Sequence, residues 1–152
     1  MNYYLMLLVF ALVSIINSYL DFKTFHISLT LNYSGLILCL LVLLIGKSPD
    51  LMNHIVGGFC LFLFFILIRW ISHKGVGWGD IHYGILCGFA AGVPGFIVCT
   101  FISSIAGIIF FLSLKFLLKR KNAFELRIPF IPMMFIGNLI GIPVTNYILS
   151  LL

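Results

Sequence analysis

Long apolar runs separated by short polar breaks fill the sequence from one end to the other. A membrane-spanning helix needs roughly 20 mostly apolar residues. We therefore expect an all-α fold, a polytopic integral membrane bundle of about six transmembrane helices that forms one domain over residues 1–152. The predicted spans are Asn2–Leu20, Leu29–Ile45, His54–Ile71, Asp80–Val93, Gly95–Leu118 and Pro129–Leu151.

The composition agrees with residence in a membrane. Hydrophobic residues make up 62% of the chain and charged residues only 9%, whereas an ordinary soluble domain has about 25% charged residues. This excludes a water-soluble globule. No basic segment precedes the first run and no small-residue cleavage site follows it, so we expect it to be retained as a helix. The four cysteines lie inside apolar runs without a Cys-x-x-Cys pair, which is typical of small buried residues.

The basic residues are distributed unevenly between the polar breaks. Eight of the nine belong to the first, third and fifth breaks, and only Lys47 belongs to another one. Because lysine and arginine are enriched in cytoplasmic loops, this pattern predicts a plasma (inner) membrane protein with both termini outside. The few, scattered charges do not indicate a nucleic-acid partner; the partner expected for such a chain is the lipid bilayer.

Only four acidic residues occur in the chain: Asp21, Asp50, Asp80 and Glu125. In the predicted topology Asp21 ends the first span and Asp80 begins the fourth, both at the cytoplasmic face. Asp50 lies about a bilayer thickness away, roughly 30 Å, and Glu125 lies within the most basic break. A carboxylate at the membrane boundary is costly unless it has a partner or a function. Asp21 and Asp80 are therefore candidates for one shared site.

The neighbours of these two aspartates favour a site. Ser14, Asn17 and Asp21 share one helical face, a polar stripe on an apolar helix. Asp80 begins a stripe with a glycine at every fourth residue, along which another helix can approach closely. If the first span packs on that stripe, the two carboxylates meet. Helix capping at Asp80 and ordinary packing of the glycines, Gly84, Gly88 and Gly92, are the plainer alternatives.

Three landmarks point to a known family. The segment Gly77–Asp80 reads Gly-Trp-Gly-Asp and resembles the Gly-x-Gly-Asp motif of intramembrane aspartyl proteases. Asp21 follows the first span and precedes an isoleucine at the spacing found in type IV prepilin peptidases and preflagellin peptidases. Ile128–Pro132 reads Ile-Pro-Phe-Ile-Pro and resembles a segment before the last helix of that family. The chain thus resembles the short form of the family, which lacks the cysteine-containing segment of larger members.

The resemblance implies an aspartic endopeptidase with Asp21 and Asp80 as the catalytic pair and no cofactor or metal. It implies that the enzyme removes the basic leader from prepilin-like or preflagellin-like precursors at the cytoplasmic face. Two such carboxylates share one proton, so that one activates water and the other donates to the scissile carbonyl. The supporting residues expected around them are Asn17, Gly77, Gly79, His82, Ile128, Pro129 and Phe130.

Two departures from the family pattern leave other readings open. Ser28-Leu29 stands where Pro-Asn is usual, and His82 stands where lysine is common. A family member that binds a pilin-like partner without cutting it is therefore one alternative. A non-enzymatic transporter, channel subunit or pilus-assembly scaffold is another, which Asn138 and Asn146 in the last span would suit. For His26 and His82 a solvated role at the membrane interface is favoured over tuning of the pair or contact with substrate, and the spacing of the histidines does not fit a zinc protease.

Overall fold

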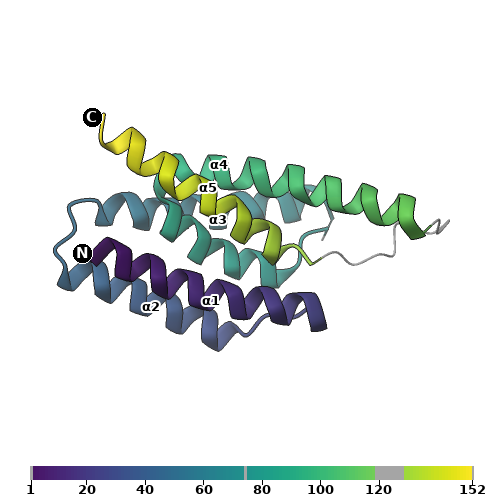
Figure 1. Cartoon of the computed structure of the whole chain (residues 1–152), viewed down its shortest axis with the longest axis horizontal. Coiled ribbons are helices and arrows are strands. Elements are labelled where there is room, and N and C mark those ends of the chain that lie inside the picture. The colour runs from purple at the N-terminus through teal and green to yellow at the C-terminus, as the bar shows by residue number, and fades with distance from the viewer. Residues whose placement is uncertain (1, 74, 119–128, 152) are drawn as a thin grey trace.

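The computed structural model describes residues 2–73, 75–118 and 129–151 of the chain. Within these residues it has five helices and no strand, which confirms the all-α class. Figure 1 shows them as a bundle in which both ends of the chain lie at the same end. The helices are α1 (Asn2–Thr24), α2 (Leu29–Ile45), α3 (Leu51–Ile71), α4 (Trp78–Leu118) and α5 (Ile131–Leu149).

Four of these helices are long and apolar enough to cross a membrane, namely α1, α3, α4 and α5, whereas α2 has only 17 residues. A membrane helical bundle is therefore supported, but the expected count of about six helices is not matched. The difference arises in α4, which is 41 residues long and joins the predicted spans Asp80–Val93 and Gly95–Leu118 in one element.

A backbone break divides α4 at Gly92, where φ is 69° and ψ is −179°. This conformation is accessible to glycine and costly for residues with a side chain. Two residues later Pro94 has no N–H to donate to the preceding turn. Figure 1 shows that the two halves of α4 run in opposite directions from this point.

Side chains of α3 satisfy the backbone groups that the break leaves free. The amide of Val93 would bond the carbonyl of Phe89 in a regular helix. Instead, Val93 N donates to Asn53 Oδ1 at 3.1 Å. His54 Nδ1 donates to the oxygen of Phe89 at 2.7 Å. Non-helical backbone is tolerated inside a membrane protein only where it finds such partners.

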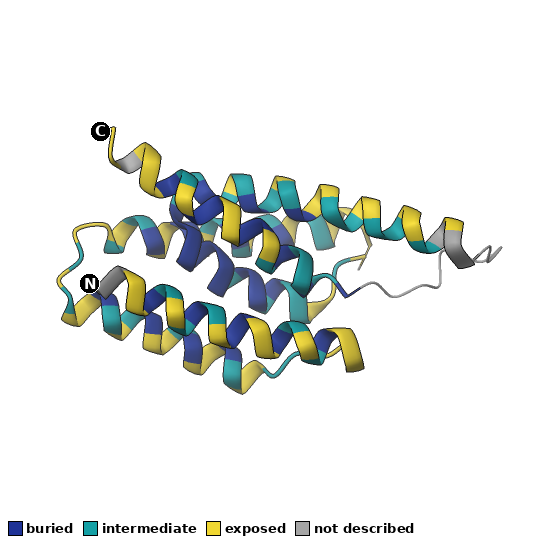
Figure 2. Cartoon of the chain, viewed as in Figure 1, coloured by how far each residue is buried: buried dark blue, intermediate teal, exposed yellow. Residues whose placement is uncertain are grey.

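The first half of α4 is the central helix of the bundle. Figure 2 shows it almost wholly buried, with the other helices around it. Its glycine stripe packs on α3: a Cβ on Gly84 would lie 2.7 Å from the ring of Phe65, and a Cβ on Gly57 would lie 2.5 Å from the oxygen of Gly88. The helix that approaches this stripe is therefore α3 and not the first span, as in the alternative of ordinary helix packing. The glycines of α3 allow the closer approach, since they face those of α4 with backbone against backbone.

The helices α1 and α2 form an antiparallel hairpin on one side of the central helix. Its turn is fixed by Asn17, whose Oδ1 accepts from Ser28 N at 3.2 Å, and by Ser28, whose Oγ accepts from Leu31 N at 3.3 Å. The hairpin reaches the rest of the bundle through α1 with α5 and through α2 with α4. One of these contacts is between Asn32 Nδ2 and the oxygen of His82, at 2.9 Å.

Candidate active site

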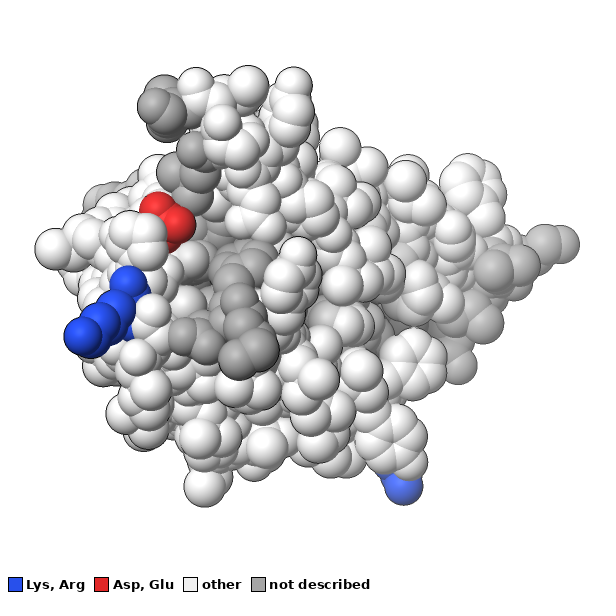
Figure 3. Space-filling view, turned by 60° about the vertical axis from the view of Figure 1, so that its left-hand side comes forward, with Lys and Arg blue, Asp and Glu red and all other residues white. Residues whose placement is uncertain are grey.

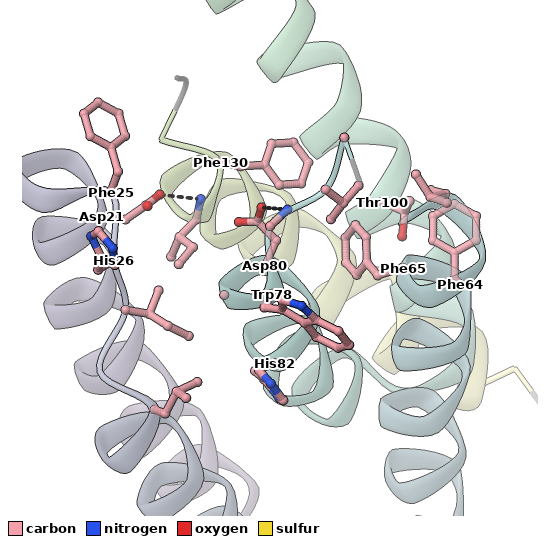
Figure 4. Close-up of a pocket in the computed structure, with 18 of the residues that line it drawn as sticks. Asp21, Phe25, His26, Phe64, Phe65, Trp78, Asp80, His82, Thr100 and Phe130 are labelled. Carbon is pink, nitrogen blue, oxygen red and sulfur yellow. Dashed lines mark hydrogen bonds between the residues drawn. The ribbon is translucent and has the colours of Figure 1, made fainter. Parts of the chain in front are cut away.

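A cavity of about 900 Å³ opens at the end of the bundle opposite the two chain ends. It lies between the last turn of α1, the first turns of α4 and α5, the end of α3 and part of the second half of α4. Asp21 and Asp80 both line this cavity, from α1 and α4 respectively, as Figure 4 shows. The structure therefore brings the two sequence-predicted carboxylates to one site, while Asp50 lies at the opposite end, directly before α3.

Asp21 belongs to the last turn of α1, where the helix dipole alone would disfavour an anion. The side chain is 7% exposed. Its Oδ2 accepts a hydrogen bond from the backbone N–H of Ile131 at 3.1 Å. Ile131 is the first residue of α5, so the carboxylate is placed at the positive end of another helix.

Asp80 lies in the first turn of α4. Its Oδ2 accepts from the backbone N–H of Gly77 at 3.2 Å, as the third residue of a helix does in a capping box. A Cβ on Gly77 would lie 3.1 Å from that same oxygen, so the absence of a side chain at Gly77 leaves room for the carboxylate. The atoms nearest to a Cβ on Gly79 would be those of Ile27, at 3.5 Å. The motif thus contributes one glycine that touches the carboxylate and another that packs on the α1–α2 turn.

The two carboxylates are close enough for their charges to interact. Each has one oxygen engaged by a backbone N–H, from Ile131 and from Gly77 respectively. In Figure 4 both side chains point into the space between α1 and the start of α4. Two like charges at short range favour a state in which the pair holds one proton. The arrangement can therefore supply a general base and a general acid together.

The remaining wall of the cavity is mainly aromatic and apolar, and most of it could not be read from the sequence. Phe64, Phe65 and Ile68 come from α3, and Thr100 and Ser104 come from the second half of α4. Of the predicted supporting residues, Phe130 joins this wall, and its ring packs edge-on against Phe65 at 6.3 Å between centroids. Nothing in an apolar run marks which positions will face a cavity, because the lipid-facing and site-facing residues are of the same kind.

The two histidines at this end of the bundle have neighbours of their own. His26 Nδ1 donates to the oxygen of Thr24 at 2.6 Å, and the charge of Asp21 interacts with His26. His82 lines the cavity, but its Nδ1 shares a hydrogen bond with the hydroxyl of Tyr33 at 2.7 Å and its ring stacks on Trp78. His82 is thus directed toward α2.

The other predicted supporting residues are placed as follows. Asn17 is fully buried and holds the α1–α2 turn through Ser28. Pro129 is buried, two residues before the start of α5. Ile128, like Glu125, lies outside the described residues. Among the residues described, no three histidine, cysteine or acidic side chains come together as a metal site would require.

Comparison with known proteins links this site to a family. The model of the type IV leader peptidase family matches residues 8–112, a stretch that includes both aspartates and the Gly-x-Gly-Asp segment. Neither a curated protein nor a solved structure matches the chain.

Proposed function

Because the chain belongs to the type IV leader peptidase family, we propose that it is an aspartic endopeptidase that removes the basic leader from prepilin-like or preflagellin-like precursors. Family membership supports a peptidase in general. The aspartic mechanism, the catalytic residues and the site of cleavage are the proposal. The observation that carries it is the meeting of Asp21 and Asp80 in one cavity, each held by a backbone N–H.

In the proposed reaction the ionised member of the pair takes a proton from a water molecule. The oxygen of that water attacks the scissile carbonyl carbon at the same time. The protonated member gives its proton to the carbonyl oxygen, and a tetrahedral diol forms. When the diol collapses, the member that took the water proton donates it to the leaving nitrogen as the C–N bond breaks, and the other member takes a proton from a diol hydroxyl, which leaves a new carboxyl terminus and returns the pair to its singly protonated state. General acid–base catalysis of this kind contributes about 10²–10⁴-fold. The two roles belong to the pair and not to one aspartate.

The shape of the molecule suits a substrate that is part polar and part apolar. Figure 3 shows a face with few charged side chains, as expected of a surface in contact with lipid. The cavity lies at one end of the helices, where a precursor's apolar helix would leave the bilayer and its basic leader would enter the cytoplasm. Many apolar side chains are exposed along the helices, such as Leu8, Phe59 and Phe101. The scissile bond would then lie at the depth of the two carboxylates.

The test is cleavage of a co-expressed prepilin by Asp21→Asn and Asp80→Asn variants. In each variant the rate of leader removal should fall by at least about 10²-fold. Each variant should still be recovered from the membrane with the parent's melting temperature. Asp50→Asn is the matched control: Asp50 lies at the far end of the bundle and this variant should cut at the parent's rate. Normal processing by either single variant would contradict the proposed pair.

Purified protein separates the proposed enzyme from a family member that only binds. The parent protein in detergent or liposomes should release the leader from a synthetic precursor. Stable binding of the precursor without any cleavage, under conditions that preserve folding, would instead support the non-cutting alternative.

A further inference from the structure

The loop between α3 and α4 is itself held in place by a side chain of α3. Arg69 lies in the last turn of α3. Its Nη1 donates to the carbonyl oxygen of Val76, and the centre of its guanidinium group lies 4.7 Å from the ring centroid of Trp78. These two contacts fall on either side of Gly77, whose N–H binds Asp80.

From this arrangement we propose that Arg69 is a positioning residue for Asp80, acting through the backbone of Gly77. The inference rests on the proposed function, because it assigns Arg69 a part in the reaction of the same site. It does not make Arg69 a catalytic residue, since its contacts are with the loop and not with the reacting groups.

Arginine is suited to this position in a way that lysine is not. Its planar guanidinium can donate in its own plane to the Val76 carbonyl while one face lies over the indole of Trp78. A lysine ammonium is a compact charge and would keep at most one of the two contacts. A lysine in place of Arg69 should therefore retain part of the positioning of the loop.

The indole of Trp78 also has a neighbour besides Arg69, the ring of His82. Trp78 stacks on His82 with 6.0 Å between ring centroids and 26° between planes, and His82 is hydrogen-bonded to Tyr33 of α2. Arg69, Trp78, His82 and Tyr33 thus form a row of side chains, here called the ring stack, that runs from α3 across the start of α4 to α2. The ring stack holds the loop against two helices. In it His82 has a structural role, since it links Trp78 to Tyr33.

A loss of this bracing should affect the reaction more than the binding of substrate. Misplacement of a catalytic group by about 1 Å can cost about 10²-fold in rate. We expect Arg69→Gln to lower kcat by about 10- to 100-fold and to change KM by less than about threefold. Arg69→Lys should fall between Arg69→Gln and the parent.

The pH profile gives a second measure that a general loss of stability would not move. An N–H donated to a carboxylate favours its ionised form, so a displaced Gly77 should move the acid limb of the kcat profile of Arg69→Gln to higher pH. Among the described residues that line the cavity, the other titratable groups are Asp21 of α1, His26 of the α1–α2 turn and His82 of α4, and the variant leaves their side chains intact.

The experiment compares the parent, Arg69→Gln, Arg69→Lys and Lys47→Gln on one synthetic precursor. Lys47→Gln is the control, since it removes a basic residue exposed at the opposite end of the bundle. Unchanged kcat and pH profile in Arg69→Gln, or an equal loss in Lys47→Gln, would overturn the inference. A parent that cuts nothing would contradict the proposed function, whereas a parent and an Arg69→Gln variant that cut equally well would contradict only the role of Arg69.

Tryptophan emission tests the placement of Arg69 without any activity. The chain has two tryptophans, and Trp70 is 78% exposed. In a Trp70→Phe background the emission comes from Trp78 alone, and Arg69→Gln should shift it because the cation leaves the face of the indole. An identical spectrum with and without Arg69 would show that the ring stack does not form.

Discussion

The two carboxylates of the site are stabilised by the same means, although their positions on their helices are opposite. Asp80 accepts the N–H of Gly77 at the start of its own helix, as helix capping predicts. Asp21 ends its helix and accepts the N–H of Ile131 at the start of α5. The first arrangement is local and could be anticipated from the sequence. The second joins residues 110 positions apart, so only the folded chain reveals it.

The departure from the family pattern at Ser28 also has a residue-scale explanation. Ser28 uses its N–H to bond Asn17 and its hydroxyl to cap α2. A proline at this position has no N–H and could not make the first bond. In this chain the turn after Asp21 is therefore held by hydrogen bonds where the usual proline would restrict the backbone.

At the same scale, Gly77→Ala should impair catalysis while the protein stays folded. The new methyl group would lie 3.1 Å from Asp80 Oδ2, and the carboxylate, as the end of a flexible side chain, would turn away. We expect kcat to fall by about tenfold or more, since catalytic groups tolerate little displacement. Single-turnover cleavage of a synthetic precursor would measure this loss.

Gly79→Ala is the comparison for that variant. Its methyl group would make an ordinary contact with Ile27 at 3.5 Å, so its effect on kcat should be clearly smaller. If the two alanine variants lost activity equally, the contact between position 77 and the carboxylate would not explain the first glycine of the motif.

At the scale of helices, the positions of the apolar segments can be predicted from the sequence, but the helices on which they pack cannot. Hydropathy is a property of one segment, so the runs around α1, α2 and α3 appear near their true positions. A packing partner is a property of two segments. The stripe of Gly84, Gly88 and Gly92 indicated close packing, but α3 and α1 are both apolar, and only the glycines of α3 distinguish them.

The walls of the site could not be predicted for a related reason. Asp21 and Asp80 stand out because acidic residues are rare in this chain. Phe64, Phe65 and Ile68 do not stand out, since they are apolar residues within an apolar run. In the sequence Arg69 is one of nine basic residues, and its contacts with Val76 and Trp78 depend on the folded conformation of the loop, which the pattern of residues does not reveal.

The break in α4 gives the element-scale prediction, which concerns Gly92→Ala. At φ 69° and ψ −179° a side chain is strained, and the new Cβ would lie 2.5 Å from Asn53 Nδ2. Backbone strain of this kind alone costs about 1–3 kcal/mol. We expect a lower melting temperature in detergent and, if the turn shifts, weaker protection of the central helix in hydrogen exchange.

Gly107→Ala serves as the control for that variant. It lies in the second half of α4, and its Cβ would meet only the ring of Phe130, at 3.3 Å. The helix propensity of alanine should offset that contact in part. Equal melting temperatures for the two variants would argue against a special backbone conformation at position 92.

For the molecule as a whole, the site depends on how the α1–α2 hairpin sits against the other helices. Asp21 belongs to the hairpin and Asp80 to the central helix. The hairpin is held through α5 and α4, partly by Phe10 against Phe135 at 6.1 Å between ring centroids and partly by Asn32 on the backbone of His82. The separation of the two carboxylates is therefore set by interhelical packing far from the cavity as well as by the cavity itself.

The orientation of this bundle in the membrane yields the last prediction. The cavity lies at the end where Lys23 is found, and the two chain ends lie at the other, with Lys47. Among the described basic residues, Lys23 and Arg69 lie in the last turns of α1 and α3, and together with the uneven distribution of basic residues along the sequence this predicts that the cavity end is cytoplasmic. In a variant without its four native cysteines, Lys47→Cys should react with a membrane-impermeant maleimide in intact cells. Lys23→Cys, also exposed, should react only after permeabilisation, and the reverse pattern would place the site on the side where a basic leader does not reside.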